Sequence, residues 1–348
     1  MEFKSYADLE ADVVRLLPRL PRDLDLIVAI PRSGMVPATM IALHLNLPLT
    51  DLTGLYEHRL IASGHRSLRS PLGGVDQKPL NVLIVDDSVG TGAQLREIRA
   101  QLAASALPHR IEVAVIYATP SGKPLVDYYA ETVPMLRHFF AWNVMHHNAI
   151  ATWCVDIDGV LCRDCTPAED DDGDHYARFL DTVEPLFIPT GKVGWLVTGR
   201  LEKHRAATEN WLHRHGVVYD HLEMFPAQTV KQRQAMGGGG PYKGAFYKRV
   251  DAGLFIESNQ HEAQTIANIA AKPVLCLDTR TMFKPGRSMQ LRKFATKGPG
   301  AYLRYIRRLF GNMQQYRQNV AATRYGQDSA HSVIDFKQGR NDDSPKQH

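Results

Sequence analysis

Two adjacent carboxylates, Asp86 and Asp87, follow the apolar run 82–85. A loop of small residues comes next, made of Ser88, Val89, Gly90, Thr91 and Gly92. Two acids at the carboxyl end of a strand suit the hydroxyls of a sugar and a nearby Mg²⁺, and a small-residue loop that opens a helix turns backbone N–H groups toward a phosphate. A plain turn would use the same residue types. Because a buried strand precedes the loop and a helix follows it, we favour a site that holds a sugar phosphate at both ends.

A second loop with anion-binding residues follows the apolar strand 26–30. It contains Pro31, Arg32, Ser33 and Gly34. Arg32 supplies positive charge, and Ser33 and Gly34 let the backbone approach an anion. The loop 31–34, which comes first along the chain and is called the first loop below, resembles the pyrophosphate loop of type I phosphoribosyltransferases. The segment 86–92 resembles the PRPP-binding motif of the same family, where PRPP is 5-phosphoribosyl-1-pyrophosphate. The resemblance implies PRPP as substrate and Mg²⁺ as cofactor. The family often has two glycines in the pyrophosphate loop. Ser33 stands in place of one of them here, so the geometry of the loop 31–34 stays open.

Two further acids, Asp156 and Asp158, lie two residues apart in the apolar segment 152–161. In an extended segment, residues i and i+2 point to the same side. The two carboxylates can therefore share one substrate phosphate and one Mg²⁺. The segment resembles the first motif of haloacid dehalogenase (HAD) phosphatases. That resemblance implies that Asp156 is the nucleophile and a metal ligand, and that Asp158 is the general acid and base and a second metal ligand.

Three later segments resemble the remaining HAD motifs in their order along the chain. Thr198 ends the strand-like run 193–200 and would bond the transferring phosphoryl group. Lys243 opens a helix-like run as the cation, and Glu257 ends a strand-like run as the third metal ligand. Two points stay open, namely Lys248 in place of Lys243, and Asn259 or Glu262 as a second acid. The interval 161–190 has room for only a small cap, and its acidic stretch Glu169–Asp174 predicts a solvated turn.

The elements that must position these residues alternate along the chain. Strand-like runs at 26–30, 80–85 and 111–117 alternate with helix-like runs at 6–17, 35–45 and 92–104. Such alternation indicates a parallel sheet with flanking helices, and ligands bind such sheets at the carboxyl ends of the strands. We therefore predict an α/β protein with two doubly wound domains. These are a type I phosphoribosyltransferase-like fold at 1–148, a HAD-like Rossmannoid fold with a small cap at 149–282, and a basic C-terminal helix and disordered tail at 283–348.

Composition places the chain among soluble globular proteins. No apolar run approaches the roughly 20 residues that span a bilayer, and four cysteines are too few for a disulfide framework, so we expect a cytoplasmic protein. The pair Cys162 and Cys165 lacks the second pair that a zinc site needs. The net charge of +4 combines a basic region from Thr281 onward with a mildly acidic remainder. That region predicts a helix packed on the second domain, with attraction to an anionic surface at the inner membrane face or to an anionic acceptor as the alternative. We expect no nucleic-acid partner.

Two loops also carry predictions. The segment 54–79 lacks periodicity and is a candidate lid over the pyrophosphate, with a plain solvated loop as the alternative. Its basic residues are Arg59, His65, Arg66, Arg69 and Lys78. Four consecutive glycines, Gly237 to Gly240, predict a flexible loop.

The two halves together resemble fused phosphoribosyltransferase–HAD proteins associated with bacterial surface polysaccharides. The resemblance implies transfer of 5-phosphoribosyl from PRPP to a glycan or other hydroxyl acceptor, and then removal of the 5-phosphate to leave ribofuranose. Two alternatives stay open. One is a nucleobase phosphoribosyltransferase fused to a nucleotidase, and the other is a PRPP- or nucleotide-sensing regulator.

Overall fold

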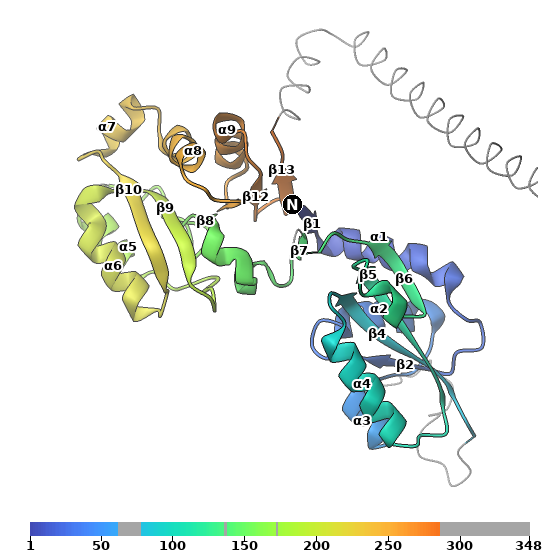
Figure 1. Ribbon diagram of the computed structural model, residues 1–348. Helices are drawn as coiled ribbons and strands as arrows, with labels where there is room; N and C mark the ends of the chain where they lie inside the picture. The colour runs from blue at the N-terminus through green and yellow to red at the C-terminus, as the bar shows by residue number, and fades with distance from the viewer. Residues whose placement is uncertain (62–77, 136–137, 172, 286–348) are drawn as a thin grey trace, which may run out of the picture. The chain divides into compact units, whose positions relative to one another are not determined.

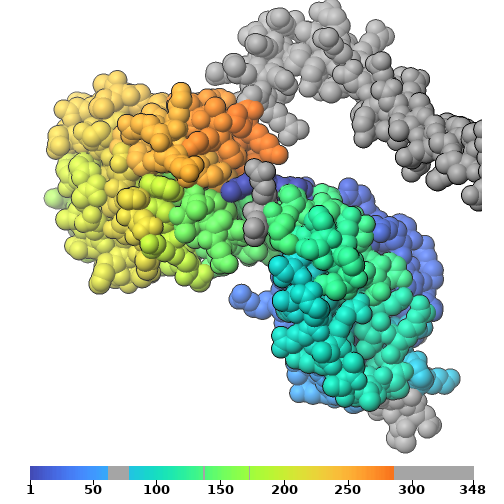
Figure 2. Space-filling view, in the orientation of Figure 1, coloured from blue at the N-terminus to red at the C-terminus, as the bar shows by residue number. Residues whose placement is uncertain are grey.

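Figure 1 shows the computed structural model, which describes residues 1–61, 78–135, 138–171 and 173–285. Within these ranges the chain forms two larger β-sheets, each flanked by helices, and one two-stranded sheet. Figure 2 shows that side chains fill the gaps between the ribbons, in keeping with the apolar strands being buried. Among the described residues, no helix combines the length and the apolar composition that crossing a bilayer requires.

The first larger sheet has five parallel strands within the described residues. In spatial order they are β3 (Leu49–Asp51), β2 (Leu26–Ala29), β4 (Asn81–Val89), β5 (Arg110–Ala118) and β6 (Tyr128–Thr132). The helices are α1 (Tyr6–Leu16), α2 (Met35–Leu45), α3 (Leu52–Tyr56) and α4 (Ala93–Ala104). Successive side chains of a strand point to opposite faces of the sheet, so both faces carry apolar side chains. Helices α1 and α2 pack against one face, and α3 and α4 pack against the other. This is the α/β sheet that the alternation predicts.

Strand β4 is longer than the predicted run 80–85. It continues to Val89 because β5 runs beside it as far as Ala118, and the two strands stay paired through Ser88 and Tyr117. The two acids of the first motif therefore lie inside the strand rather than after it. Their side chains point to opposite faces as a consequence.

The second larger sheet has six strands within the described residues, and only β13 runs antiparallel. In spatial order they are β10 (Tyr219–Phe225), β9 (Val193–Leu201), β8 (Cys154–Val155), β11 (Phe255–Glu257), β12 (Val274–Cys276) and β13 (Thr281–Phe283). The helices are α5 (Asp174–Thr182), α6 (Arg205–Arg214), α7 (Val230–Ala235), α8 (Gly239–Arg249) and α9 (Gln260–Ala270). Helices α5 and α6 cover one face, and α8 and α9 cover the other.

Several local predictions differ from the structure. The segment 152–161 is extended only over β8, because the chain turns after Asp156 and the amide of Leu161 bonds the carbonyl of Ile157 at 2.8 Å. The predicted glycine loop is half helical, since Gly239 and Gly240 begin α8. The interval 161–190 contains α5, which packs on the sheet.

The remaining described elements are short. Strands β1 (Glu2–Lys4) and β7 (His138–Phe140) pair in parallel. The 3-10 helices are η1 (Leu17–Arg19), η2 (Lys123–Leu125), η3 (Val144–His146), η4 (Asn148–Thr152) and η5 (Glu202–His204). Part of the predicted lid and the predicted C-terminal helix and tail, 286–348, lie outside the described residues, as do His65, Arg66 and Arg69. At the edge of the lid segment, Arg59 is exposed and pairs with Glu57 at 3.2 Å.

Trp211 tests the packing of α6 on the second larger sheet. Its ring is fully buried, and its indole N–H donates to the carbonyl of Val183 at 2.7 Å. Trp211→Ala should lower the free energy of unfolding by about 3–5 kcal/mol, because it leaves a cavity and an unbonded carbonyl. The measurement is urea unfolding followed by circular dichroism. The exposed Val218 gives the control Val218→Ala, which should stay within about 0.5 kcal/mol of wild type. Equal effects of the two changes would contradict this packing.

Candidate functional site

A cavity of about 330 Å³ lies where β4 passes into α4. Its wall includes Asp86, the loop from Ser88 to Gly92, and the first residues of α4. The first backbone N–H groups of a helix have no partner inside the helix and attract anions. Gly92 caps α4 with a φ of +76°, and a Cβ there would come within 2.0 Å of the Leu125 side chain. The left-handed backbone at Gly92 favours glycine, while the end of the Leu125 side chain could move aside. The cavity combines an anion-binding helix terminus with one carboxylate.

The two acids of the first motif have different surroundings. Asp86 lines the cavity. Asp87 is 5% exposed, and its carboxylate accepts hydrogen bonds from the Ser33 hydroxyl at 3.0 Å and from the indole N–H of Trp142 at 2.6 Å. The sequence predicts two acids that act together on a ligand, whereas the structure holds Asp87 against its own chain. The contact of Trp142 with Asp87 was not predicted from the sequence. The one signal for it is that Trp142 belongs to the aromatic-rich stretch 139–142.

The loop of Arg32, Ser33 and Gly34 meets strand β4 at one glycine. A Cβ on Gly34 would lie 2.5 Å from the carbonyl oxygen of Ile30 and 2.6 Å from that of Val85. Only glycine lets the first loop approach β4 this closely. The peptide bond between Pro31 and Arg32 is cis, and the Arg32 side chain is exposed. The structure therefore brings the loop of Arg32, Ser33 and Gly34 next to the strand that carries the acids, as a ligand shared by both loops requires.

Burial and the neighbouring Asp87 charge raise the pKa of Asp86 to about 8. The backbone N–H of Asp87 donates to the Asp86 carboxylate at 2.8 Å and opposes this rise. Asp86 therefore takes up a proton near neutral pH when the cavity holds no cation.

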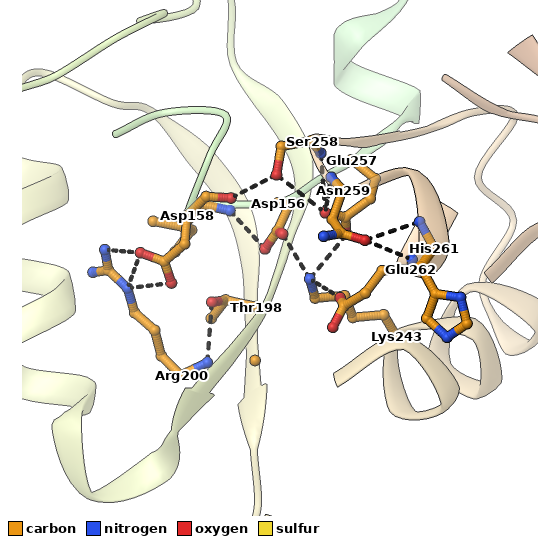
Figure 3. A network of polar contacts seen from close by, with 12 residues as sticks. Asp156, Asp158, Thr198, Arg200, Lys243, Glu257, Ser258, Asn259, His261 and Glu262 are labelled. Atoms are coloured by element: carbon orange, nitrogen blue, oxygen red, sulfur yellow. Dashed lines mark hydrogen bonds and ion pairs between the residues drawn. The ribbon is translucent and has the colours of Figure 1, made fainter. Parts of the chain in front are cut away.

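The second set of predicted residues meets around a buried lysine (Figure 3). The ammonium of Lys243, on α8, donates to Asp156 at 2.6 Å, to Glu257 at 2.9 Å and to Glu262 at 2.8 Å. Lys243, Asp156 and Glu257 are each less than 5% exposed. Burial and the Glu257 charge raise the pKa of Asp156, while the three carboxylates raise the pKa of Lys243 against the effect of burial. These residues line a cavity of about 400 Å³.

Asp158 lines the same cavity but has a separate partner, Arg200. The Arg200 guanidinium donates through Nε and Nη2 to the Asp158 carboxylate, with Nη2 at 2.6 Å from Oδ1. Burial would raise the pKa of Asp158, but the Arg200 charge and its hydrogen bonds bring it below the ordinary value. Thr198 is fully buried, and its hydroxyl accepts from the backbone N–H of Arg200 at 3.1 Å. No motif in the sequence assigned a role to Arg200, although it stands two residues after Thr198.

The structure distinguishes among the alternatives left open by the sequence. Lys243 lies among the carboxylates, and Lys248 is exposed. Glu262 contacts Lys243, whereas Asn259 caps α9 by accepting from its first backbone N–H groups. All four cysteines are free, in keeping with the absence of a disulfide framework.

The acidic stretch of the small-cap interval is organised by local hydrogen bonds. Asp171 accepts from backbone N–H groups at the start of α5, and Glu169 pairs with Arg163 at 2.6 Å. Among the described residues, no three His, Cys, Asp or Glu side chains stand in an arrangement ready for a metal ion. The predicted metal ligands Asp156, Asp158 and Glu257 line one cavity, but their carboxylates are directed at Lys243 and Arg200.

Asp86→Asn should remove a pH-dependent cost to stability. Because the pKa of Asp86 is about 8 in the folded protein and 3.8 ordinarily, the folded state binds a proton that the unfolded state releases between these values. Stability from this group is therefore lost as pH rises through that window, by at most about 1.4 kcal/mol per pH unit. Thermal unfolding without metal should show Asp86→Asn gaining on wild type from about pH 5 to about pH 8. Glu97→Gln, at an exposed position on α4, should follow wild type. A gain that grows toward acid pH would contradict the raised pKa.

Comparison with known proteins matches residues 3–148 to the phosphoribosyl transferase domain family. A xanthine-guanine phosphoribosyltransferase of Chromohalobacter salexigens is 36% identical over 132 residues, which cover 37% of this chain and 75% of that protein. An enzyme of the same name from Nitratidesulfovibrio vulgaris is 35% identical over 103 residues, 29% of this chain and 57% of that protein.

Among solved structures, the xanthine-guanine-hypoxanthine phosphoribosyltransferase of Helicobacter pylori is 19% identical. The structural match covers 41% of this chain and 92% of the Helicobacter pylori protein, with a TM-score of 0.32. The assignment rests on the sequence matches, which span both anion loops, Asp86 and Asp87 within residues 3–148. This chain therefore belongs to the phosphoribosyltransferase family.

Proposed function

We propose that this chain transfers 5-phosphoribosyl from PRPP to an acceptor and then removes the 5-phosphate from the product at a second site. The observation that carries the first step is the cavity that joins Asp86 to the N-terminus of α4. A ribose 5-phosphate needs both features, since its phosphate is an anion and its hydroxyls are hydrogen-bond donors. Family membership supports the same step.

In the transfer, the bond between C1 of the ribose and the pyrophosphate oxygen breaks, and the electron pair leaves with pyrophosphate. The acceptor forms the new bond to C1 and gives up a proton. Asp86 would hold the ribose hydroxyls and stabilise the developing positive charge. It is also the titratable side chain among the described residues that line the cavity, so it is our candidate for the base. Ser88 to Gly92 would hold the 5-phosphate, and Arg32 to Gly34 the pyrophosphate.

Mg²⁺ fits the chemistry of the first site. It would be held near Asp86 by oxygen ligands and would neutralise charge on the leaving pyrophosphate. Asp87 would act by fixing the first loop through Ser33, since its carboxylate is already bonded there and to Trp142.

The second step rests on the cluster around Lys243, whose residues resemble those of HAD phosphatases in type and order. Asp156 would attack the phosphorus, and the ester oxygen would leave with a proton from Asp158. Water would then give a proton to Asp158 and attack the phosphorus of the aspartyl-phosphate. The bond between phosphorus and the Asp156 oxygen would break, which releases inorganic phosphate and restores the Asp156 carboxylate. Lys243 and Thr198 would stabilise the phosphoryl group. Asp156 and Glu257 would supply oxygen ligands for Mg²⁺ if the Lys243 ammonium moved away, and the ion would offset the phosphoryl charge. Asp158, the third predicted ligand, does not fit this role as the structure stands, because Arg200 holds both of its carboxylate oxygens.

The comparisons favour a purine base as the acceptor. Both curated relatives described above are named for xanthine and guanine, and they match the domain that holds the first cavity. This supports the nucleobase alternative over transfer to a glycan. Under this proposal the second site would act as a nucleotidase on the nucleotide formed.

One observation favours a second candidate, a hydroxyl group of a glycan. The chain carries a buried cluster with the residue types for removing a phosphate from a monoester. A nucleotide-forming enzyme would lose its product at such a site. A pathway that needs bare ribofuranose on a sugar would require it. The resemblance to polysaccharide-associated fusion proteins supports this candidate.

An acceptor panel separates the two candidates. Purified protein is incubated with PRPP, Mg²⁺ and either purine bases or oligosaccharides, and products are identified by mass. Pyrophosphate release is measured in parallel. Release that depends on xanthine, guanine or hypoxanthine supports the first candidate, and pentose addition to a sugar supports the second. Asp86→Asn should lower turnover at least about 100-fold with the true acceptor, whereas Glu97→Gln should match wild type. Release unaffected by Asp86→Asn would contradict the assigned site.

Asp156→Asn tests the second step. The amide cannot form the aspartyl-phosphate, so the transfer product should accumulate with its phosphate retained. Mass spectrometry should find it heavier by one phosphate than the wild-type product, while pyrophosphate release stays at the wild-type rate. Asp181→Asn, which alters an exposed acid on α5, should yield the dephosphorylated product. Full dephosphorylation by the Asp156→Asn variant would show that Asp156 is not the nucleophile.

A further inference from the structure

A buried arginine holds the carboxylate of Asp158 in the second cavity. Arg200 is 1% exposed, and it belongs to β9 of the second larger sheet. Its Nε lies 3.0 Å from Oδ2 of Asp158, and its Nη2 lies 2.6 Å from Oδ1 (Figure 3). Two nitrogens on two oxygens fix the plane of the carboxylate as well as its position.

The arginine is itself fixed on its other sides. Its Nη1 lies 3.5 Å from the hydroxyl of Thr208 on α6, and its Nη2 lies 3.2 Å from the sulfur of Cys162. Its backbone N–H bonds the hydroxyl of Thr198. A guanidinium with contacts to helix α6 and to the turn after β8 has little freedom to reorient.

Burying a charged pair costs desolvation energy, and the attraction between the charges often fails to exceed that cost. Stability alone is therefore a poor reason for this pair, which stands beside the cavity rather than in an apolar core. The carboxylate of Asp158 lines the cavity, 23% of its side chain is exposed, and Arg200 is completely covered. The exposed member of the pair is the one that can reach a substrate.

We propose that Arg200 is a positioning residue for phosphate-ester cleavage: it orients Asp158 toward the oxygen that leaves the phosphorus. This inference rests on the proposed phosphatase function. In the step concerned, Asp156 forms a bond to phosphorus, the phosphorus–oxygen ester bond breaks, and the departing oxygen takes a proton from Asp158. Asp158 would acquire that proton as the phosphate dianion enters the cavity, because the added negative charge opposes the effect of Arg200. Arg200 touches neither the substrate nor the proton.

The proposal predicts an effect that depends on the leaving group. An alkoxide leaves poorly without a proton, whereas p-nitrophenolate leaves well without one. Misplacing Asp158 should therefore slow the release of phosphate from ribose 5-phosphate much more than from p-nitrophenyl phosphate. A disturbance of the nucleophile or of folding would slow both substrates alike.

The experiment compares wild type with Arg200→Met, a substitution of similar length without hydrogen-bond donors. For ribose 5-phosphate, kcat should fall by about 100-fold, the lower range for general acid catalysis. For p-nitrophenyl phosphate, kcat should fall by less than about 10-fold, and KM should change little for both, since binding groups are intact. Arg214→Met removes an arginine from the exposed pair with Asp181 and should leave both substrates unchanged.

Two milder variants keep the test decisive if Arg200→Met fails to fold. Arg200→Lys retains the charge without the two-point contact and should show the same selective loss in smaller degree. Thr208→Val removes one support of the guanidinium and should act in the same direction. Equal loss on both substrates, or no loss on either, would overturn the role of Arg200. A wild-type protein that hydrolyses neither ester would instead contradict the phosphatase assignment, and this role with it.

Discussion

Carboxylates crowded at the ends of parallel strands repel one another, and both candidate sites depend on how the chain offsets that repulsion. Parallel sheets bring the carboxyl ends of neighbouring strands to one edge, so side chains distant in sequence meet there. Burial of a carboxylate strengthens this repulsion, since the protein interior screens charge less than water does. Each buried acid must therefore take up a proton, find a cation, or accept hydrogen bonds from neutral donors.

The two sites use different solutions. In the first cavity, Asp87 accepts from the neutral donors Ser33 and Trp142, while Asp86 has no cationic partner in the described structure and its pKa rises to about 8. In the second cavity, Lys243 lies among three carboxylates, and Arg200 holds the fourth. The first site therefore has room for a cation brought by a ligand. The second carries its own cations, and the Lys243 ammonium would have to move from Asp156 and Glu257 to admit a metal ion there.

Within each acidic pair, one member is fixed by the protein. Asp87 ties the strand β4 to the loop that precedes α2, and Asp158 is oriented by an arginine from β9. In the first pair the other acid, Asp86, lines the cavity, whereas in the second pair Asp156 is also held, by the Lys243 ammonium. The chemistry proposed for the two sites is also consecutive, since transfer from PRPP would yield a phosphomonoester and hydrolysis of such an ester is the reaction proposed for the second site.

The sequence by itself determined the α/β class of the described chain, the first-loop glycine and the residue types at both cavities. Those features follow from apolar periodicity and from local backbone needs, such as the close approach at Gly34. Only the tertiary structure separated Asp86 from Asp87, because the length of β4 depends on its pairing with β5. Only the tertiary structure brought Trp142 to Asp87, Glu262 to Lys243 and Arg200 to both oxygens of Asp158. These contacts join residues far apart in the chain, and their partners are chosen by strand order and packing, which local sequence patterns do not encode.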